Sequence, residues 1–192
     1  MMKQMLSVAE KLNPGPWVKH SYFTGKAAAN IGKALNLNPE RCYILGCLHD
    51  IGRRFGKTLI KHVIDGYTFL ETLGFPAAAR ICITHSFPYK DITSYSGIID
   101  CSIEESSFIK DYLNGIVYND YDKLIQLCDT IAWSSGFCLM EKRMIAVVMR
   151  HGITNTTMKK WEAFFKIKNE FEQRIGVTIY KLLPGVTKTT FL

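Results

Sequence analysis

Apolar residues recur every three or four positions along most of the chain, which is the spacing of one buried helix face. Glycine, proline and residues able to cap a helix separate these stretches, and the strict alternation typical of strands is rare. The predicted helices span residues 3–12, 16–35, 39–50, 59–73, 76–85, 103–113, 120–132, 139–150 and 158–175. Residues 177–183 alternate as a strand would, but a single strand has no partner, so we expect this tail to pack on the helices.

Local capping signals support these boundaries. Asn38 followed by Pro39 predicts a helix start, and Ser102 with Glu105 forms the pattern of a capping box. Asn119 can cap the following helix in the same way. The pattern therefore predicts an all-α fold, a compact helical bundle, and the absence of repeats or linkers predicts one domain over residues 1–192.

One apolar run ends in adjacent polar residues. The run 42–48 leads directly into His49 and Asp50, which are followed by a basic, glycine-marked turn. An imidazole beside a carboxylate offers the nitrogen and oxygen ligands that divalent metals such as Zn, Fe, Mn or Ni accept. The alternative is a polar pair at a helix end, with Asp50 solvated and His49 bonded to a backbone carbonyl.

Two further polar residues lie on apolar helix faces. Asp129 has Ile125 four residues before it and Ala132 three after it, which places it on the buried side of its helix. Burying an ionised carboxylate without a partner costs several kcal/mol, so Asp129 needs a metal ion, or a lysine or arginine from a neighbouring helix. His20 lies on the apolar face of the helix 16–35, where it is either a ligand or a hydrogen-bonded core residue.

The order His20, His49-Asp50, Asp129 resembles the HD-domain superfamily of metal-dependent phosphohydrolases. The sequence Leu-His-Asp-Ile-Gly at 48–52 and the sequence Asp-Thr-Ile-Ala at 129–132 strengthen the resemblance, which covers about residues 20–132. It implies a helical bundle of the HD type, with these four residues as ligands of one metal and the helices 139–175 packed on the motif region.

The segment between the two aspartates resembles the part in which many members add two histidines. The resemblance implies that His62 and His85 hold a second metal, with Asp50 as the bridge. The alternatives are a surface position for His62 and a helix C-terminal imidazole for His85, which interacts with the helix dipole. His151 fits that last description better and lies outside the motif, so we assign it a structural role. The metals would be one or two divalent ions, with Fe, Mn, Co, Ni, Zn and Mg all open.

The resemblance also implies a chemistry. A bound metal lowers the pKa of water and makes hydroxide available for attack on a phosphoryl group. The expected catalytic residues are His49, Asp50, Arg53 and Lys57. The expected phosphate-binding residues follow the ligands in sequence, with ordinary surface solvation as the alternative for each: Arg53, Arg54, Lys57, Lys61 and, as a weaker candidate, Lys90. Phe87, Tyr89 and Tyr95 could stack on a base, although such residues are more often core.

Composition restricts the class further. The chain has 47% hydrophobic and 21% charged residues, with a formal net charge of +7 and a pI near 9.1, so anionic partners are favoured. The basic residues 159–160 and 166–168 most simply form a solvated helix face, and no stacking platform accompanies them, which disfavours nucleic acid. Six scattered cysteines predict reduced core thiols. No apolar stretch suggests a membrane span or a signal peptide, so we expect a cytoplasmic protein that does not bind membranes.

The resemblance, together with the polar residues on buried helix faces, implies a metal-dependent phosphohydrolase, which we expect to cleave a phosphomonoester or phosphodiester of a nucleotide or related small metabolite. No phosphate-binding loop, nucleophile elbow or His-Glu-x-x-His motif competes for the chemistry. One alternative is a non-catalytic nucleotide- or signal-binding module that retains the scaffold. Another is a nucleic-acid-binding protein driven by net charge. The expected partner is a small phosphorylated metabolite or nucleotide, and monomer and homodimer are both compatible with the sequence.

Overall fold

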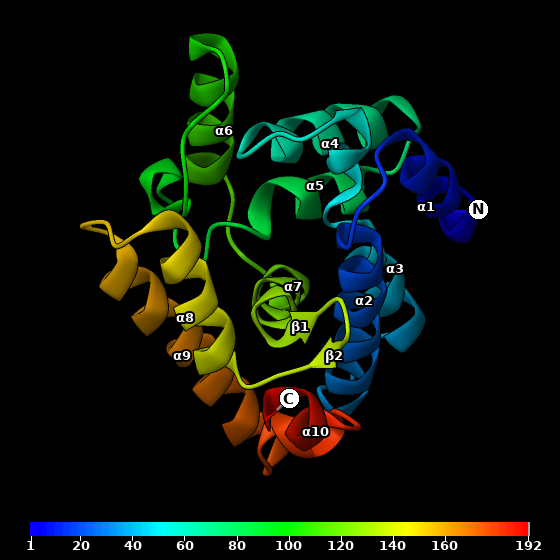
Figure 1. Ribbon diagram of the computed structural model, residues 1–192, viewed down its shortest axis with the longest axis vertical. Helices are drawn as coiled ribbons and strands as arrows, with labels where there is room; N and C mark the ends of the chain where they lie inside the picture. The colour runs from blue at the N-terminus through cyan, green and yellow to red at the C-terminus, as the bar shows by residue number, and fades with distance from the viewer. Residues whose placement is uncertain (192) are drawn as a thin grey trace.

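Helices make up most of the part of the chain that the computed structural model describes, residues 1–191 (Figure 1). They are α1 (Met2–Leu12), α2 (Trp17–Ala34), α3 (Pro39–Leu48), α4 (Lys61–Thr72), α5 (Pro76–Thr84), α6 (Ile103–Gly115), α7 (Asp120–Ile131), α8 (Met140–His151), α9 (Thr157–Ile175) and α10 (Val186–Phe191). Three short 3-10 turns cover Ile51–Phe55, Ile92–Ser94 and Ile179–Leu182. The all-α prediction is confirmed, since about 70% of the structure is helical.

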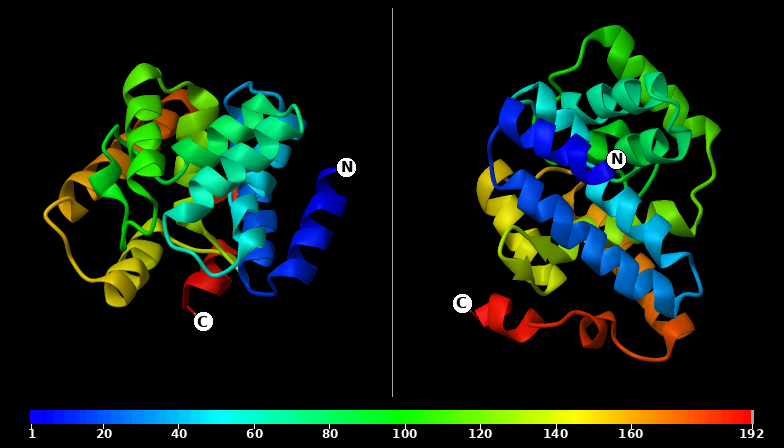
Figure 2. Two further views of the ribbon diagram at one scale, coloured as in Figure 1. Left: turned by 90° about the horizontal axis from the view of Figure 1, so that it is seen from above. Right: turned by 90° about the vertical axis from the view of Figure 1, so that its right-hand side faces the viewer.

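Helix α7 occupies the centre of the molecule, with α2 and α3 on one side and α8 and α9 on the other (Figure 1). Its apolar side chains are fully buried: Leu124, Ile125, Leu127, Cys128 and Ile131. Helices α6 and α10 lie at opposite ends of the long axis, as Figure 1 and the right-hand view of Figure 2 show. A residue on α7 is therefore close to most of the other helices, and α7 carries Asp129.

The predicted helix starts at Asn38, Ser102 and Asn119 are confirmed. The Asn38 side chain accepts a hydrogen bond from Arg41 N, with Pro39 as the first helical residue. Capping boxes open α6 at Ser102 and α7 at Asn119. Each cap satisfies backbone N–H groups that a helix start otherwise leaves without partners.

Glycines let α2 and α3 approach closely. A Cβ atom at Gly46 would lie 2.7 Å from Gly25 Cα, and one at Gly25 would lie 2.6 Å from Cys47 Sγ. Any larger side chain at these positions would push the two helices apart. Because His20 and His49 lie on these helices, the close approach also sets their separation.

Two segments outside the long helices, residues 132–137 and the C-terminal tail, have structures that the sequence pattern does not indicate. Residues 132–137 form a small antiparallel hairpin, β1 (Ala132–Trp133) with β2 (Gly136–Phe137), in which Ala132 faces Phe137. The sequence gives no sign of it, because two-residue strands are too short to show alternation. The strand-like tail forms the 3-10 turn Ile179–Leu182 and packs on the helical body through buried Ile179 and Leu183.

All six cysteines are free thiols, as predicted. Five are buried, whereas Cys101 is only half-buried and so is not a core residue. Among the described helices, none combines the length and apolar character that a bilayer crossing requires.

Candidate metal centre

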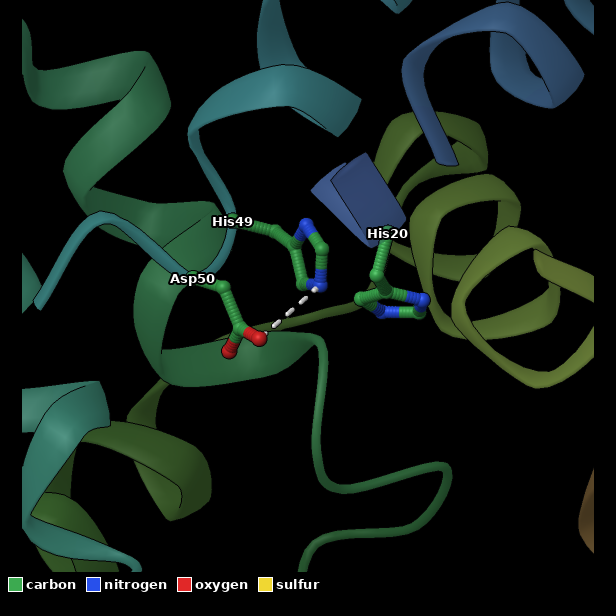
Figure 3. Close-up of side chains that lie close together, drawn as sticks. All are labelled: His20, His49 and Asp50. Atoms are coloured by element: carbon green, nitrogen blue, oxygen red, sulfur yellow. Dashed lines mark ion pairs between the residues drawn. The ribbon is translucent and has the colours of Figure 1, made fainter. Parts of the chain in front are cut away.

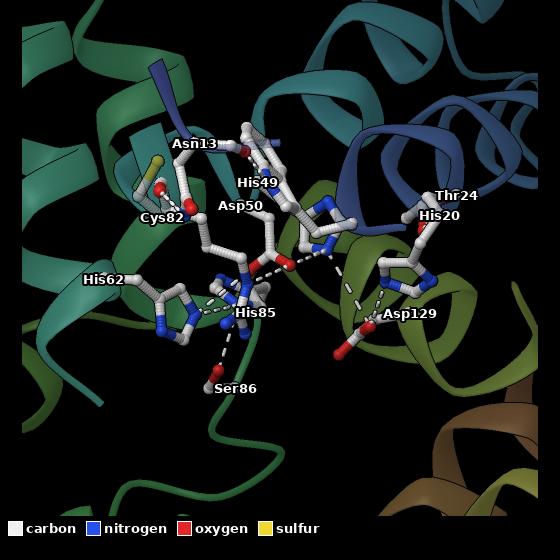
Figure 4. Close-up of polar contacts among 12 residues, drawn as sticks. Asn13, His20, Thr24, His49, Asp50, His62, Cys82, His85, Ser86 and Asp129 are labelled. Atoms are coloured by element: carbon white, nitrogen blue, oxygen red, sulfur yellow. Dashed lines mark hydrogen bonds and ion pairs between the residues drawn. The ribbon is translucent and has the colours of Figure 1, made fainter. Parts of the chain in front are cut away.

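Six polar residues from five parts of the chain converge beside the central helix (Figure 4). His20 is in the first turn of α2 and Asp129 is near the end of α7, while His49 and Asp50 follow α3. His62 is in the first turn of α4 and His85 follows α5. Their candidate ligand atoms form three groups, within each of which all atoms lie within 4.8 Å of one another: His20, His49 and Asp50; His49, His85 and Asp129; Asp50, His62 and His85.

Backbone carbonyls orient three of the histidines. Nδ1 of His49 donates to Gly46 O at 2.7 Å, and Nδ1 of His85 donates to Ile81 O at 3.1 Å. His62 Nδ1 donates in the same way to Leu59 O. A proton on Nδ1 leaves Nε2 as the lone-pair atom, and in each case Nε2 is directed toward the other ligands. This arrangement is typical of metal-binding histidines.

Asp50 lies between two groups of histidines (Figure 4), with His49 and His20 on one side of it (Figure 3). Its Oδ1 is 3.0 Å from His62 Nε2 and 3.6 Å from His85 Nε2, whereas its Oδ2 is 3.7 Å from His49 Nε2. On the far side, Asp129 Oδ1 is 2.8 Å from His20 Nε2 and 3.8 Å from His49 Nε2. The carboxylate of Asp50 is thus placed to be shared between two metal positions.

Two of these atoms are buried without a hydrogen-bond partner in residues 1–191: His49 Nε2 and Asp50 Oδ1. Leaving a buried polar atom unsatisfied costs about 1–3 kcal/mol, and more for a charged group. His62 Nε2 and His85 Nε2 also lie 3.4 Å apart, and the Ser86 hydroxyl, 3.0 Å from His85 Nε2, supplies a donor to only one of them. A cation satisfies all of these atoms at once, so the residues fit one or two divalent metals.

The charges of the site favour the ligand protonation states that a metal requires. Burial alone would raise the pKa of Asp50, but the charges of Arg53, His49 and His62 hold it well below its usual range. The pKa of Asp129 is also lowered, because the hydrogen bond and charge of His20 outweigh burial. Burial lowers the pKa of His85 to about 3 and lowers that of His20. Anionic carboxylates and these neutral imidazoles are therefore present at neutral pH.

Gly52 explains how the turn after Asp50 meets helix α4. A Cβ atom at this position would lie 2.0 Å from His62 O and 2.5 Å from Gly66 N. Only glycine allows the turn to pack this closely on the helix backbone. Because Asp50 and His62 are on the two packed segments, this contact brings their side chains together.

The comparison with protein families agrees with this geometry. A family model described as HD domain matches residues 17–133. The chain belongs to the HD domain family. The matched segment runs from the first residue of α2 to the end of β1 and contains all six converging residues. HD domains are mostly metal-dependent hydrolases. No curated protein and no solved structure matches the chain.

The surroundings of His62 and Asp129 in the HD domain do not match the non-ligand alternatives for these residues. His62 is 1% exposed, so it is not a surface residue. No lysine or arginine in residues 1–191 lies within 4.0 Å of the Asp129 carboxylate, whose ion-pair partners are histidines. The Asp129 side chain is 27% exposed, so it faces a cavity and is not enclosed in the core.

Only one of the predicted phosphate-binding residues lines the cavity at this site. Arg53 does so, with its Nε 2.6 Å from Asp50 Oδ2. The Lys61 ammonium instead pairs with Asp65 at 2.8 Å and Glu105 at 2.7 Å, because neighbouring helix positions point about 100° apart and His62 takes the inward one. The Arg54 guanidinium lies 4.1 Å from the centre of the Phe69 ring. Lys57 and Lys90 are not in the cavity lining either.

Basic residues that sequence reasoning did not assign to the site do line the cavity. Arg143, Arg150 and His151 come from α8, and Lys160 comes from α9. His151, to which the sequence assigns a structural role, lies at the cavity because it is the last residue of α8. Lys160 is half-buried and not part of a solvated face, and burial lowers its pKa to about 8.

Of the three aromatic residues that could stack on a base, one lines the cavity and two do not. Tyr95 lines the cavity, whereas Phe87 is buried in the core and Tyr89 lies beneath Lys159, 4.4 Å from the ring centre to Nζ. Trp161 and Phe164 of α9 form further apolar lining. The sequence signal that could have revealed the α8 residues is their spacing, because positions 143, 147, 150 and 151 share one helix face.

Proposed function

We propose that this HD domain is a metal-dependent phosphohydrolase that cleaves a phosphomonoester or phosphodiester of a nucleotide or related small metabolite. The observation that carries the proposal is the convergence of six ligand-type side chains around two buried atoms that lack hydrogen-bond partners in the described chain, His49 Nε2 and Asp50 Oδ1. A site built only for stability would satisfy such atoms within the protein.

The residues divide into two overlapping sets. His20, His49, Asp50 and Asp129 would hold one divalent ion, and His62 and His85 would hold a second, with Asp50 shared. When bound, such ions lower the pKa of water and neutralise negative charge that develops on a phosphoryl group. The identity of the metal follows from neither set, because mixed imidazole and carboxylate ligation suits several metals.

Arg53 has two functions in this proposal. Its Nε–H donates to Asp50 Oδ2 at 2.6 Å, which fixes the orientation of the shared carboxylate. Burial would lower the pKa of Arg53, but Asp50 raises it, so the guanidinium stays charged. Its remaining N–H groups can donate to phosphate oxygens in the cavity, where a guanidinium offers two parallel hydrogen bonds.

The first experiment measures metal content together with hydrolysis of an aryl phosphate and a panel of nucleotides. We expect the wild-type protein to contain, or to take up, a transition metal and to turn over at least one phosphoester. Asp50→Asn keeps the shape of the side chain but removes its charge, so kcat should fall by about 100-fold or more together with metal content. Asp111→Asn, on the exposed surface of α6, is the matched control and should behave as wild type.

The outcomes separate the candidate functions. Bound metal without turnover of any phosphoester would favour a nucleotide- or signal-binding module that keeps the HD scaffold. Neither metal nor turnover, even after addition of Mn²⁺ or Co²⁺, would refute the proposed hydrolase.

A further inference from the structure

Helices α8 and α9 form a basic wall across the cavity from the candidate ligands. We define the α8–α9 wall as Arg143, Arg150, His151 and Lys160, all of which line the same cavity as His20, Asp50, His62 and Asp129. These helices lie on the opposite side of α7 from α2 and α3 (Figure 1). They also lie outside residues 17–133, so the family match says nothing about what the wall does.

The two arginines and the lysine of the wall lack acidic partners in the described chain. Within residues 1–191, no aspartate or glutamate oxygen lies within 4.0 Å of the side-chain nitrogens of Arg143, Arg150 or Lys160, whereas Arg53, Lys61, Arg80, Lys123, Lys168 and Arg174 are all paired. Among the described residues, Lys160 Nζ donates one hydrogen bond, to Ser96 Oγ at 3.3 Å, and lies 5.9 Å from the centre of the Phe164 ring. Unpaired cations facing one space repel one another, and an anion in that space would remove the repulsion.

The amount of charge argues for more than one phosphate group. Four permanently or normally cationic side chains line the cavity, Arg53 and the three of the wall, against the two carboxylates of Asp50 and Asp129. The surplus is two positive charges before any metal is counted, and each divalent ion adds two more. One phosphate dianion therefore leaves a positive excess that a second phosphate would neutralise.

The positions of the basic side chains along the cavity also fit a ligand with more than one phosphate group. Arg143 lies close enough to His20 and Asp129 for its charge to influence both pKa values. Arg150 is two turns further along α8, about 10 Å along the helix axis. Lys160 of α9 lines the same cavity, where its charge acts on His151 and the charge of Asp129 acts on it. Positive charge thus spans about two turns of α8 along the cavity wall.

We propose that the α8–α9 wall is a second anion-binding subsite and that the substrate carries a chain of at least two phosphates, as a nucleoside diphosphate or triphosphate does. Arg150 and Lys160 bind the phosphate that is not cleaved. The substrate class rests on the proposed phosphohydrolase activity, whereas the anion subsite itself does not require it.

The test measures binding of inorganic tripolyphosphate and of orthophosphate by calorimetry, with the full chain stripped of metal and at physiological ionic strength. Tripolyphosphate should bind at least about tenfold more tightly than orthophosphate. Arg150→Gln and Lys160→Gln should each weaken tripolyphosphate binding about tenfold, because each removes charge-assisted hydrogen bonds. Arg150 is exposed and unpaired in the described chain, so its replacement leaves the core intact.

The control is Lys166→Gln, which removes one charge from an exposed position of α9 outside the cavity. It corrects for nonspecific attraction to a chain of net charge +7 and should bind tripolyphosphate as the wild type does. Equal affinities for the two phosphates, or variants indistinguishable from Lys166→Gln, would overturn the subsite.

A kinetic arm with metal-loaded protein tests the substrate class. The ratio of kcat/KM for a nucleoside triphosphate to that for an aryl monophosphate should fall about tenfold in Arg150→Gln and remain unchanged in Lys166→Gln. An unchanged ratio in Arg150→Gln overturns the substrate class. Tight tripolyphosphate binding without hydrolysis of any phosphoester would refute the proposed hydrolase and leave the subsite standing.

Discussion

A single methyl group at position 52 tests how the fold assembles the candidate metal centre. In Gly52→Ala, the new Cβ would lie 2.0 Å from His62 O, 2.5 Å from Gly66 N and 2.9 Å from His62 C. All three atoms belong to the backbone of α4, so no side chain can rotate away to make room. The helix and the turn must therefore separate by on the order of 1 Å to reach ordinary contact distances.

The size of the effect follows from this contact. Overpacking a core usually destabilises a protein by about 1–3 kcal/mol. Because backbone meets backbone here, we expect the upper end, about 3 kcal/mol. In a protein of this length each kcal/mol lowers Tm by about 2–4 °C, so Tm should fall by about 6–12 °C. The separation also draws His62 away from Asp50, whose Oδ1 is now 3.0 Å from His62 Nε2.

Thermal unfolding followed by circular dichroism, together with metal content per chain, measures both effects. Gly115→Ala is the matched control, because no heavy atom lies within 4 Å of its Cβ and its φ is not in the left-handed region. That variant should be as stable as wild type or slightly more so. If Gly52→Ala has the Tm and the metal content of Gly115→Ala, the contact between the turn and α4 does not build the site.

Two further predictions concern buried charges. Arg80 pairs with the fully buried Asp122 at 2.7 Å, so Arg80→Met should lower the free energy of unfolding, measured in urea, by about 3–5 kcal/mol. The control Arg41→Met removes a guanidinium 4.6 Å from the Tyr121 ring centre and should lower it by less than about 1 kcal/mol. Equal losses in the two variants would contradict the prediction. Burial lowers the pKa of His85 to about 3 from an unfolded value of about 6.5, so between these values the unfolded state binds the extra proton and stability falls as pH falls. For the metal-free protein this group alone should make unfolding about 2 kcal/mol easier at pH 5 than at pH 7.5, and an undiminished pH dependence in His85→Gln would exclude it as the cause.

Most helix boundaries were predictable because their signals are local. The caps at Asn38, Ser102 and Asn119 and the breaks at glycine and proline act within one turn of the chain. The β1–β2 hairpin was not predictable, since two paired residues on each side leave no periodic pattern. Its pairing depends on packing against α2 and α10, which are distant in sequence.

The candidate ligands were visible one by one, but not their convergence. His49 and Asp50 stand out at the end of an apolar run, and Asp129 stands out within an apolar stripe. Their distances depend on contacts that no spacing reveals, such as Gly25 against Gly46 and Gly52 against His62. The expectation that these residues form one site came from the resemblance to HD domains, and the family match supports that resemblance.

The basic residues show why nearness in sequence misleads. Lys61 is adjacent to His62 in sequence, yet on a helix adjacent side chains diverge, and Lys61 pairs with Asp65 and Glu105 outside the cavity. Arg150 is far from every ligand in sequence and lines the cavity with them. The ligands come from the family-matched segment, but most of the unpaired charge facing them comes from α8 and α9. If that charge selects the substrate, chains with the same ligands and different C-terminal helices should prefer different phosphoesters, and the specificity of this one should follow α8 and α9 when they are exchanged.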